Sequence, residues 1–544
     1  MTKLTVAITV QSLEQALAAS ARAAEHGADL VEFRIDAFTD RPAQLPQLVE
    51  QSALPCIATC RPTWEGGACG LSDMERVAVL EHACAGARRP AYIDYELAAY
   101  QKSPDVRRRV NNLVDHPGQV QPTDTGLILS THDFEGRPID MTQRLEAMAA
   151  ASACRVIKVA WLARSLRDNL EAFEIVMHRY KPTIALCMGD AGLPSRVLAG
   201  KFNALLTFAA LGPGAGTAIG QPNVADLKGL YRWDAIDAQT RVFGVIGHPI
   251  GHSLSPAVHN AGFDAIGFNA VYLPMPVPPE YEHLKATVLS WLDMPELDFR
   301  GASVTIPHKE NLLRLAKSRA AAGARVEVEP LAERIGAANT LTVRDDGSLY
   351  VCNTDYAAAL DAVCGALSVE REGLRDKRVA VIGAGGVARA VVAGFAQCGA
   401  TVVVYNRTLE KAEALASALA GVAAEHHGKV VAAPLEKLCD SCCQVYINCT
   451  PIGMHPNVDA SPLAGLAGER PRGWSDGAVV FDTIYNPAET RLLREAREAG
   501  CRTIAGTQMF VRQAAAQFAL WTGQAAPIDV FDQVMTRRLE ASGG

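Results

Sequence analysis

The sequence of 544 residues lacks the features of a membrane protein or a nucleic-acid-binding protein. Its longest apolar stretches are interrupted by Arg389 or by glycine before they reach the length that spans a membrane. Basic residues are not in excess, since 52 Lys and Arg stand against 59 Asp and Glu, a net charge of −7. No global positive field is therefore expected to hold nucleic acid or an anionic membrane, and anionic small molecules would need local clusters of Arg or Lys.

A secretory signal is also missing, because the opening residues MTKLTVAITV have the pattern of a strand. We therefore expect a cytoplasmic protein whose 14 cysteines are reduced and buried, without disulfides. Cys439 and Cys442 form one CxxC pair beside Cys443, but no second pair at zinc spacing accompanies them. Core packing is the favoured interpretation of these cysteines, and no metal site is predicted.

The composition is that of an ordinary globular protein, with 49% apolar and 20% charged residues. At roughly 150 residues per domain, this length predicts three or four compact units, or fewer if one of them is a large barrel. No low-complexity linker separates the two halves of the chain; only the short polar stretch from Trp233 lies between them.

The first half repeats one unit eight times. Short apolar or β-branched runs begin near Leu4, Leu30, Cys56, Tyr92, Leu127, Val156, Thr183 and Leu206. Ala-rich and Leu-rich segments with helical periodicity lie between most of them, such as the one that starts at Ser12, a predicted N-cap, and stops at Gly27. This alternation predicts an α/β fold with a (β/α)8 TIM barrel over residues 1–235.

Polar residues stand at the carboxyl ends of these strands, where barrels of this kind place their chemistry. A single such residue is more simply explained as part of an ion pair that closes the barrel mouth. The number of residues that converge on one rim favours an active site instead. They are Glu32, Arg34, Arg61, Glu65, Asp94, Glu96, His132, Asp133, Lys158, Arg196, Thr217 and Gln221.

Lys158 is the residue best suited to covalent chemistry, because its neighbours in sequence are apolar. Desolvation and nearby arginines should disfavour its ammonium form, and a neutral amine can attack a ketone to give an imine. His132, one strand away, could remove the acidified proton, with Glu65 orienting the imidazole. We expect the arginines to bind a carboxylate, above all Arg196 on a loop that looks mobile.

Several motifs in register resemble type I 3-dehydroquinate dehydratase over residues 1 to 230. They are EFRID, CRPTWEGG, STHDFEGRP, VIKVA, LPSR and GTAIGQ. The resemblance implies Lys158 as the Schiff-base lysine, His132 as general acid and base, and Glu65 as its partner. It implies as substrate contacts Glu32, Arg34, Arg61, Arg196, Thr217 and Gln221. Thr217 and Ile219 replace the family's usual serine and proline, in a Gly-rich segment from Gly212 that could close as a lid.

In the second half, Ser253 and Ser255 precede a helix whose N-terminus could hold an anion, with Ser255 as its N-cap and Pro256 as its first residue. Capping alone explains both serines equally well. Further on, Lys309 and Asp355 follow strands, and such residues are usually solvated loop charges. A Lys–Asp couple beside an anion site could instead handle the proton that accompanies reduction of a ketone.

Residues 378–408 read as strand, Gly-rich turn, helix and strand, the context of a dinucleotide-binding fingerprint. The turn fits G-x-G-x-x-A and comprises Gly383, Ala384, Gly385, Gly386, Val387 and Ala388. The second strand ends not on the acidic residue typical of NAD enzymes but on Asn406, Arg407 and Thr408, with Lys411 one turn later. Positive charge there predicts NADP(H) as the cofactor; plain surface charge is the alternative.

The motifs SLSP, SVTIPHK, GAANT, NTD, GAGGVARA, NRT, NCTPIGM and GTQMFVRQA resemble shikimate dehydrogenase across residues 241–544. The resemblance implies Lys309 and Asp355 as the catalytic pair and Thr450, Met454 and Gly506 near the nicotinamide. It implies as substrate contacts Ser253, Ser255, Thr305, Asn339, Asp355, Tyr485 and Gln513. Ser303 and Tyr356 stand where many bacterial members of the family have Asn and Gly. In both positions the sequence resembles the fused dehydratase-dehydrogenases of plants.

The resemblance also implies a substrate-binding domain at 241–355, a Rossmann NADP domain at 356–505, and C-terminal helices at 506–544 that return to the substrate-binding domain. The predicted function is dehydration of 3-dehydroquinate to 3-dehydroshikimate, followed by NADPH-dependent reduction to shikimate. A quinate-preferring dehydrogenase half and a non-catalytic ligand-sensing regulator remain as alternatives. The expected partners are these small molecules, with no nucleic acid and no membrane; the oligomeric state is left open.

Overall fold

The computed structural model describes residues 1–119, 122–467 and 470–542. The chain divides into two compact units. The first comprises Met1–Arg241, Asn269–Pro276 and Thr287–Asp298, and the second comprises Val242–Phe268, Val277–Ala286 and Phe299–Gly544. Among the helices of the described residues, none is long and apolar enough to cross a membrane.

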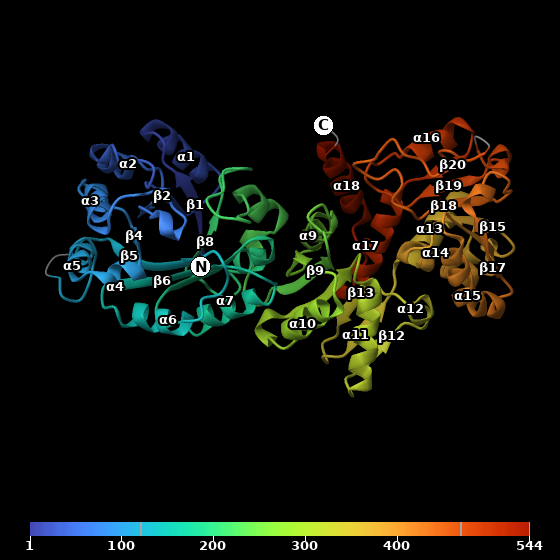
Figure 1. Cartoon of the computed structure of the whole chain (residues 1–544), viewed down its shortest axis with the longest axis horizontal. Helices are drawn as coiled ribbons and strands as arrows, with labels where there is room; N and C mark the ends of the chain where they lie inside the picture. The colour runs from blue at the N-terminus through green and yellow to red at the C-terminus, as the bar shows by residue number, and fades with distance from the viewer. Residues whose placement is uncertain (120–121, 468–469, 543–544) are drawn as a thin grey trace. The chain divides into compact units, whose positions relative to one another are not determined.

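The first unit contains the predicted barrel of eight parallel strands (Figure 1). The strands are β1 (Lys3–Thr9), β2 (Leu30–Arg34), β3 (Cys56–Thr59), β4 (Tyr92–Glu96), β5 (Gly126–Asp133), β6 (Cys154–Leu162), β7 (Thr183–Met188) and β8 (Leu206–Ala209). Their order is β7-β6-β5-β4-β3-β2-β1-β8, and every neighbouring pair is parallel. The barrel is nearly closed, because the Leu205 N–H donates to the Thr183 carbonyl at 3.0 Å beside the first residues of β7 and β8.

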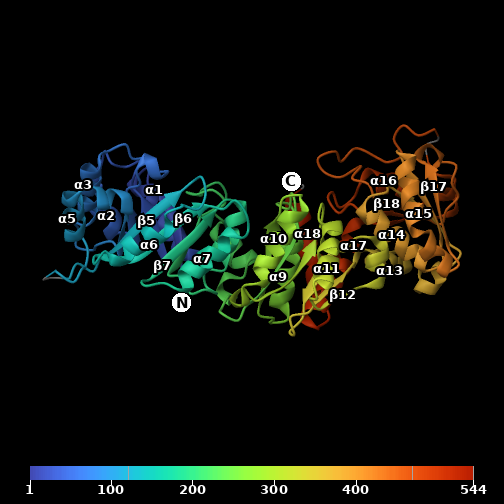
Figure 2. The ribbon, with the colours of Figure 1, turned by 60° about the horizontal axis from the view of Figure 1, so that its bottom comes forward.

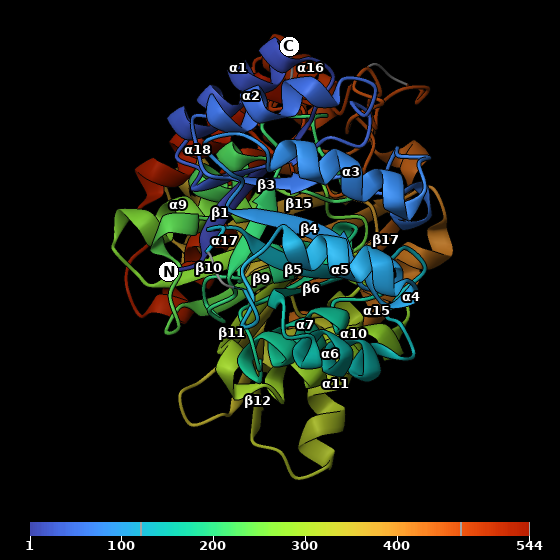
Figure 3. The same ribbon diagram turned by 90° about the vertical axis from the view of Figure 1, so that its left-hand side faces the viewer.

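Helices lie outside these strands, as Figures 1 and 3 show. They are α1 (Leu13–Glu25), α2 (Leu45–Glu50), α3 (Asp73–Ala83), α4 (Leu97–Lys102), α5 (Pro104–Asn112), α6 (Met141–Ala150), α7 (Asp168–Met177) and α8 (Leu193–Val197). Ser12 caps α1 as predicted, since its Oγ accepts a hydrogen bond from the Gln15 N–H at 3.3 Å. Gly27 follows the end of α1 with a φ of +75°, a conformation that favours glycine.

The amino-terminal part of the barrel interior is apolar and supports the polar mouth. Its core cluster comprises Ala7, Leu30, Ile57, Ile128, Val156, Ile184, Leu186, Leu206 and Phe208. Because side chains alternate along a strand, Val156 and Lys158 of β6 point to the same side. Val156 fills the core, and the same alternation turns Lys158 toward the carboxyl end of the barrel interior.

The second sheet has six strands in the order β10-β9-β11-β13-β14-β12. They are β9 (Arg241–Gly247), β10 (Ala270–Pro276), β11 (Phe299–Val304), β12 (Val326–Val328), β13 (Thr340–Val343) and β14 (Leu349–Cys352). The helices of this part are α9 (Ser255–Ala265), α10 (Tyr281–Leu292), α11 (Lys309–Ala321) and α12 (Pro330–Ile335). From the chain's end, α17 (Gly506–Thr522) packs on β11 and β13, and α18 (Ile528–Ser542) packs on α9.

The third sheet is parallel throughout and has the order β17-β16-β15-β18-β19-β20. Its strands are β15 (Arg378–Ile382), β16 (Thr401–Asn406), β17 (Lys429–Pro434), β18 (Val445–Asn448), β19 (Val479–Asp482) and β20 (Arg502–Ile504). The helices α13 (Asp355–Leu367), α14 (Gly386–Gln397), α15 (Leu409–Glu425) and α16 (Arg491–Glu498) accompany them (Figure 2).

This strand order is that of a Rossmann fold, in which a dinucleotide binds where the order reverses, here between β15 and β18. Along β15, Val379 and Val381 belong to one core cluster and Ala380 and Ile382 to another. Both faces of the strand are therefore buried, as expected for a parallel sheet covered on both sides.

Two candidate active sites

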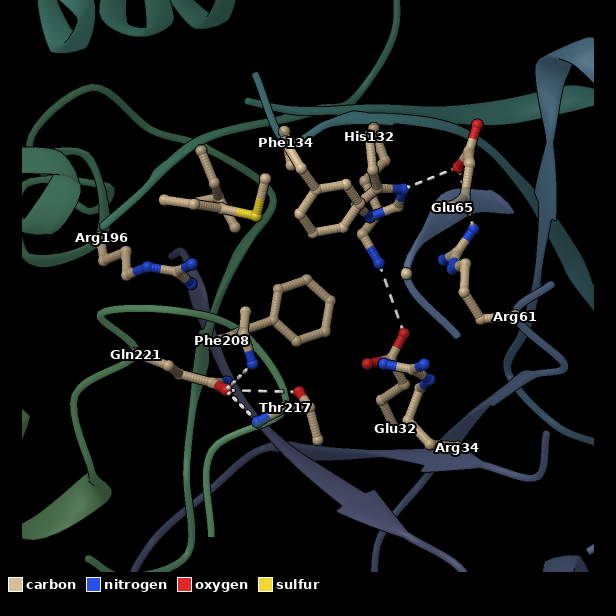
Figure 4. Close-up of a pocket in the computed structure, with 16 residues that line it drawn as sticks. Glu32, Arg34, Arg61, Glu65, His132, Phe134, Arg196, Phe208, Thr217 and Gln221 are labelled. Carbon is tan, nitrogen blue, oxygen red and sulfur yellow. Dashed lines mark hydrogen bonds and ion pairs between the residues drawn. The ribbon is translucent and has the colours of Figure 1, made fainter. Parts of the chain in front are cut away.

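A pocket opens at the carboxyl ends of the barrel strands (Figure 4). It brings together all nine residues that the sequence analysis assigned to the first reaction: Glu32, Arg34, Arg61, Glu65, His132, Lys158, Arg196, Thr217 and Gln221. The rest of the lining is mostly apolar and comprises Gly66, Phe134, Ala160, Leu186, Met188, Phe208 and Ala218. A largely apolar pocket with a few convergent charged groups is the usual form of a small-molecule site.

Lys158 lies inside this pocket with its side chain 6% exposed. Its Nζ donates to Asp94 Oδ2 at 2.8 Å and to Glu32 Oε1 at 3.3 Å, and it lies 4.4 Å from the centre of the Phe208 ring. Sequence reasoning did not anticipate these two carboxylates as direct partners of the amine. That the ammonium form is disfavoured stays a prediction. In this state of the protein the lysine is part of a compensated set of charges.

Asp94 is a fixed anion behind the pocket. Arg61 Nη2 donates to its Oδ1 at 2.8 Å, and the Ser130 hydroxyl donates to the same oxygen at 2.6 Å. Burial opposes ionisation, but Arg61 and then Lys158 hold the pKa of the Asp94 carboxyl far below its usual range. Asp94 therefore stays charged throughout the physiological pH range.

His132 and Glu65 form a pair in which Nδ1 lies 2.9 Å from Glu65 Oε2 (Figure 4). Burial raises the pKa of Glu65 to about 8, with Arg61 opposing the shift. Burial, reinforced by the positive charges of Arg61 and Lys158, lowers the pKa of His132 well below its usual value. A neutral imidazole thus faces a carboxyl group that titrates near physiological pH, which suits proton transfer.

Of the three arginines that line the pocket, Arg196 is the one whose guanidinium is not already paired with a carboxylate in the described residues. It is 2% exposed, forms no salt bridge in the described part of the chain, and its Nε has no hydrogen-bond partner there. Burial lowers its pKa to about 10, with Cys187 opposing the shift. By contrast, Arg34 is held by Asp36 through two hydrogen bonds of 2.9 and 3.0 Å.

The expected mobile loop around Arg196 is instead the short helix α8. Pro194 suits its first turn. Ser195 anchors it: its N–H donates to Asn169 Oδ1 at 3.0 Å, and its Oγ accepts from the Cys187 N–H at 2.8 Å. These local bonds, invisible as a pattern in the sequence, fix the arginine at the pocket.

The loop after β8 carries Thr217 and Gln221. Gln221 Oε1 accepts from the Thr217 N–H at 2.8 Å and from the Thr217 hydroxyl at 3.3 Å, so the side chain folds the loop on itself. Gly212 and Gly214 have open space where a side chain would be, and Ile219 is exposed. Closure of this segment as a lid remains a prediction.

Sequence reasoning missed Phe134, Met188 and Phe208 in the pocket lining. A signal for two of them existed. Phe208 lies at an inward position of β8, and Met188 stands two residues after Leu186 on β7 and so shares its side of the strand.

In the second unit, Lys309 is the first residue of α11 and Asp355 the first residue of α13. Lys309 Nζ donates to Asp355 Oδ2 at 2.7 Å, so the structure forms the predicted couple. Asn339 Nδ2 donates to the other carboxylate oxygen at 2.9 Å, and Asn353 Oδ1 accepts from the Asp355 N–H at 3.0 Å. Both carboxylate oxygens therefore have a partner.

The other predicted substrate contacts of this half are not hydrogen-bonded to the couple in the part of the chain that the structure describes. They are Ser253, Ser255, Thr305, Tyr485 and Gln513. Ser255 is not the N-cap, which was wrong: α9 begins at Ser255, and Leu254 holds the cap position without a side-chain bond. The Ser255 N–H instead donates to Ser253 Oγ at 3.3 Å. No side chain of the described residues caps α9, so the other N–H groups of its first turn can bind a ligand.

The predicted dinucleotide turn joins β15 to α14. Gly383 has a φ of +109°, and a Cβ there would lie 2.9 Å from Thr450 Cγ2, so only glycine fits. Gly385 and Gly386 face open space, and no side chain caps α14. These features fit a pyrophosphate at the helix N-terminus.

The loop after β16 presents Asn406, Arg407 and Thr408, and Lys411 lies in the first turn of α15. Arg407 and Lys411 are exposed, and within the described ranges neither side chain has a hydrogen bond or an ion pair. Thr450 and Met454 follow β18, and Gly506 opens α17. Free cations beside a dinucleotide turn fit the additional phosphate of NADP(H).

Family models match four segments of the chain. Type I 3-dehydroquinase matches residues 4–238, the shikimate dehydrogenase substrate binding domain 245–341, shikimate/quinate 5-dehydrogenase 367–437, and the shikimate 5'-dehydrogenase C-terminal domain 506–536. The chain is 37% identical over 547 residues to the chloroplastic bifunctional 3-dehydroquinate dehydratase/shikimate dehydrogenase of Arabidopsis thaliana, covering 97% of the chain and 83% of that relative.

Its second half resembles single-function relatives. It is 41% identical over 305 residues to the shikimate dehydrogenase (NADP(+)) of Methanosarcina mazei, covering 55% of the chain and 99% of that protein. Among solved structures, the dehydroquinate dehydratase and shikimate dehydrogenase from S. pombe matches with 26% identity and a TM-score of 0.42, over 98% of both chains.

Proposed function

The chain belongs to the family of bifunctional 3-dehydroquinate dehydratase/shikimate dehydrogenases, and on this premise we propose which side chains carry each reaction. The chain is a lyase and an NADP-dependent oxidoreductase of the shikimate pathway. It dehydrates 3-dehydroquinate to 3-dehydroshikimate and reduces this product to shikimate. The observation that carries the residue assignment is the convergence of Lys158, the His132–Glu65 pair and Arg196 on one pocket.

In the first site, Lys158 attacks the ketone and forms an imine with loss of water. Its ammonium must first release a proton, and Glu32 is the pocket-lining carboxylate nearest to it, at 3.3 Å. The protonated imine then draws electrons from C2 while His132 Nε2 takes the C2 proton. His132 returns a proton to the departing C1 hydroxyl, and hydrolysis of the imine releases the product.

Arg196 binds the substrate carboxylate. It is buried and holds no salt bridge within the described chain, and a buried cation of this kind gains most from an anionic ligand. Arg34 and Arg61 are already paired with Asp36 and Asp94, so they shape the pocket's field. Thr217 and Gln221 contact the substrate from the loop above.

In the second site, Lys309 and Asp355 hold the proton that the ketone oxygen receives on reduction. When bound, NADPH supplies the hydride to the same carbonyl carbon. Asn339 orients the Asp355 carboxylate through its Nδ2 donor. Ser253, Ser255, Thr305, Tyr485 and Gln513 are assigned to the substrate, and Thr450, Met454 and Gly506 to the nicotinamide side.

The NADP(H) site comprises the turn Gly383–Ala388 for the pyrophosphate and the cations after β16 for the 2′-phosphate. We divide the chain at 1–235 for the dehydratase, 241–355 for substrate binding, 356–505 for the cofactor and 506–544 for the returning helices. All 14 cysteines are free, which supports a cytoplasmic protein, although the Arabidopsis thaliana relative is named as chloroplastic. Cell fractionation checks the compartment.

One assay tests both activities together. Purified protein is mixed with 3-dehydroquinate and NADPH, and the nicotinamide absorbance band is followed. Cofactor oxidation without any added enzyme is expected. Oxidation that requires an added dehydratase would contradict the role of the barrel, and turnover of quinate in preference to shikimate would favour a quinate dehydrogenase, an alternative that the family matches do not favour.

A further inference from the structure

Arg76 is a fully buried arginine that lies on the outer helix α3 and not at the barrel mouth. Its Nη1 donates to Glu96 Oε2 at 2.6 Å and to the carbonyl of Cys60 at 2.8 Å, and its Nη2 donates to Asp73 at 3.0 Å. The Arg76 guanidinium therefore links Glu96, the last residue of β4, to the backbone of Cys60, which directly precedes Arg61. Such a costly burial of charge needs an explanation.

A chain of ion pairs runs from Arg76 to the lysine of the pocket. Glu96 Oε1 accepts from Arg61 Nη1 at 2.8 Å, Arg61 Nη2 donates to Asp94 at 2.8 Å, and Asp94 accepts from Lys158 at 2.8 Å. Neither Glu96 nor Asp94 lines the pocket. Arg76, Arg61 and Lys158 are the three cations that hold the buried carboxylates Glu96, Asp94 and Glu32. Asp73 is a further, partly exposed partner of Arg76, and Glu65 lies beside Arg61.

We propose that Arg76 is a positioning residue of the dehydratase: by holding the Glu96 carboxylate, it keeps the Arg61 guanidinium on Asp94 and off Glu65. The proposal rests on the assignment of the first site given above. Arg61 Nη1 already lies 3.6 Å from Glu65 Oε2, so Glu65 is the next carboxylate that Arg61 can reach.

Without Arg76, only Arg61 and Lys158 would remain to hold Glu96, Asp94 and Glu32. Burial raises the pKa of Glu96, and Arg61 and Arg76 together oppose this shift, so Glu96 would tend to take up a proton when Arg76 is lost. Arg61 would then lose one anchor and turn toward Glu65. The charged groups that face Glu65 are Arg61, Arg144, Asp94 and Glu96, and the neutral imidazole of His132 lies beside it. Closer approach of Arg61 lowers the pKa of Glu65.

The test compares Arg76→Met with wild type in dehydratase kcat, KM and pH profile. Because the pair His132–Glu65 would be misaligned, we expect kcat to fall about 10-fold or more while KM changes less. The pH at which dehydratase activity rises should move down with the pKa of Glu65. Shikimate oxidation by the same chain should be unchanged, which separates this result from general misfolding. Wild-type dehydratase activity is measured first, because its absence would overturn the proposed function rather than this inference.

Arg109→Met is the matched control, since Arg109 on α5 pairs with Glu81 on α3 at 2.8 Å without contact to the pocket. It should leave dehydratase kcat and the pH profile unchanged. An Arg76→Met enzyme with the kcat and pH profile of wild type would overturn the proposal, even if its thermal stability were reduced.

Glu96→Gln and the double variant complete the test. If Arg76 acts through Glu96, the double variant should be no slower than Glu96→Gln alone; effects that multiply would overturn the proposal. Should Arg76→Met fail to fold, Arg76→Lys decides. Lysine keeps the positive charge beside the Glu96 carboxylate, so we expect the pH profile of Arg76→Lys to match wild type. A shifted profile would overturn the proposal, because it would show that this positive charge is not what positions Arg61.

Discussion

The two reaction sites each contain a lysine paired with an aspartate, and the pairs are almost the same length: 2.8 Å for Lys158–Asp94 and 2.7 Å for Lys309–Asp355. Their surroundings differ. Lys158 lies in the middle of a strand, and its amine has a second carboxylate partner, Glu32. Its first partner, Asp94, is held in turn by Arg61 and Ser130. Lys309 and Asp355 each stand at the first residue of a helix, and Asn339 is the further partner of the carboxylate.

The difference assigns different chemistry to the same two residue types. Asp94 is fixed by a network and stays charged, so it positions Lys158 and takes no proton. Asp355 sits at the positive end of a helix dipole beside a more exposed lysine, where a proton can pass to a ligand. The identity of a lysine–aspartate pair therefore says less about its function than the partners of the aspartate do.

The largest expected effect comes from breaking the first pair. Lys158→Ala should lower dehydratase kcat roughly 10⁴-fold or more, because the covalent step has no substitute nucleophile. Reduction of 3-dehydroshikimate by the same chain should be unchanged. Lys102→Ala, an exposed lysine of α4, is the control and should keep both activities. Retained dehydration in Lys158→Ala would contradict the assignment.

Breaking the second pair should give the opposite pattern. Asp355→Asn should reduce shikimate dehydrogenase kcat by about 10²- to 10⁴-fold, the usual contribution of a general acid or base, while dehydration continues at the wild-type rate. Because the pair acts as a unit, adding Lys309→Met should cause little further loss. Multiplying losses in the double variant, measured by steady-state kinetics, would contradict a shared role.

Only the second site is expected to bind a cofactor, so a change in cofactor preference should leave dehydration unaffected. Arg407→Ala removes a charge-assisted contact worth about 1.5–3 kcal/mol, so KM for NADPH should rise roughly 10- to 100-fold. KM for NADH should stay constant, as it has no 2′-phosphate. Lys429→Ala, at the amino end of β17, is the control and should change neither value. Equal losses with both cofactors would refute the 2′-phosphate role.

A pH dependence is also expected, and only for the reaction of the barrel. Below its pKa of about 8, the Glu65 carboxyl is protonated and donates its hydrogen bond to His132 Nδ1. The single N–H of the neutral imidazole is then on Nε2, which cannot accept a proton. Above this pKa, the carboxylate accepts from Nδ1 and Nε2 is free to take a proton. Dehydratase kcat/KM should therefore rise about tenfold per pH unit up to pH 8 and then level off.

Glu65→Gln should abolish this rise, because its amide oxygen accepts from Nδ1 at every pH. The dehydrogenase activity of the same variant should keep its wild-type profile. A Glu65→Gln enzyme that still shows the rise would assign the titration to another group.

The sequence predicted the barrel strands and a rim of twelve polar residues from local rules, and the resemblance to the dehydratase family reduced these twelve to the nine that line the pocket. Apolar runs of strand length mark β1–β8, and parallel strands bring their carboxyl ends to one rim. The helix around Arg196 depends on local bonds that no periodicity encodes, whereas alternation along β8 could have found Phe208. The link from Arg76 through Glu96 to Arg61 joins residues up to 35 positions apart by side-chain reach, so it needed the structure.

Lys158, and not Lys309, is expected to form a covalent bond with the substrate. The protein is incubated with 3-dehydroquinate, reduced with borohydride and digested, and the modified peptide is identified by mass spectrometry. A single adduct is expected, on the peptide that contains Lys158. An adduct on Lys309, or no adduct on Lys158 in enzyme that dehydrates its substrate, would contradict this expectation.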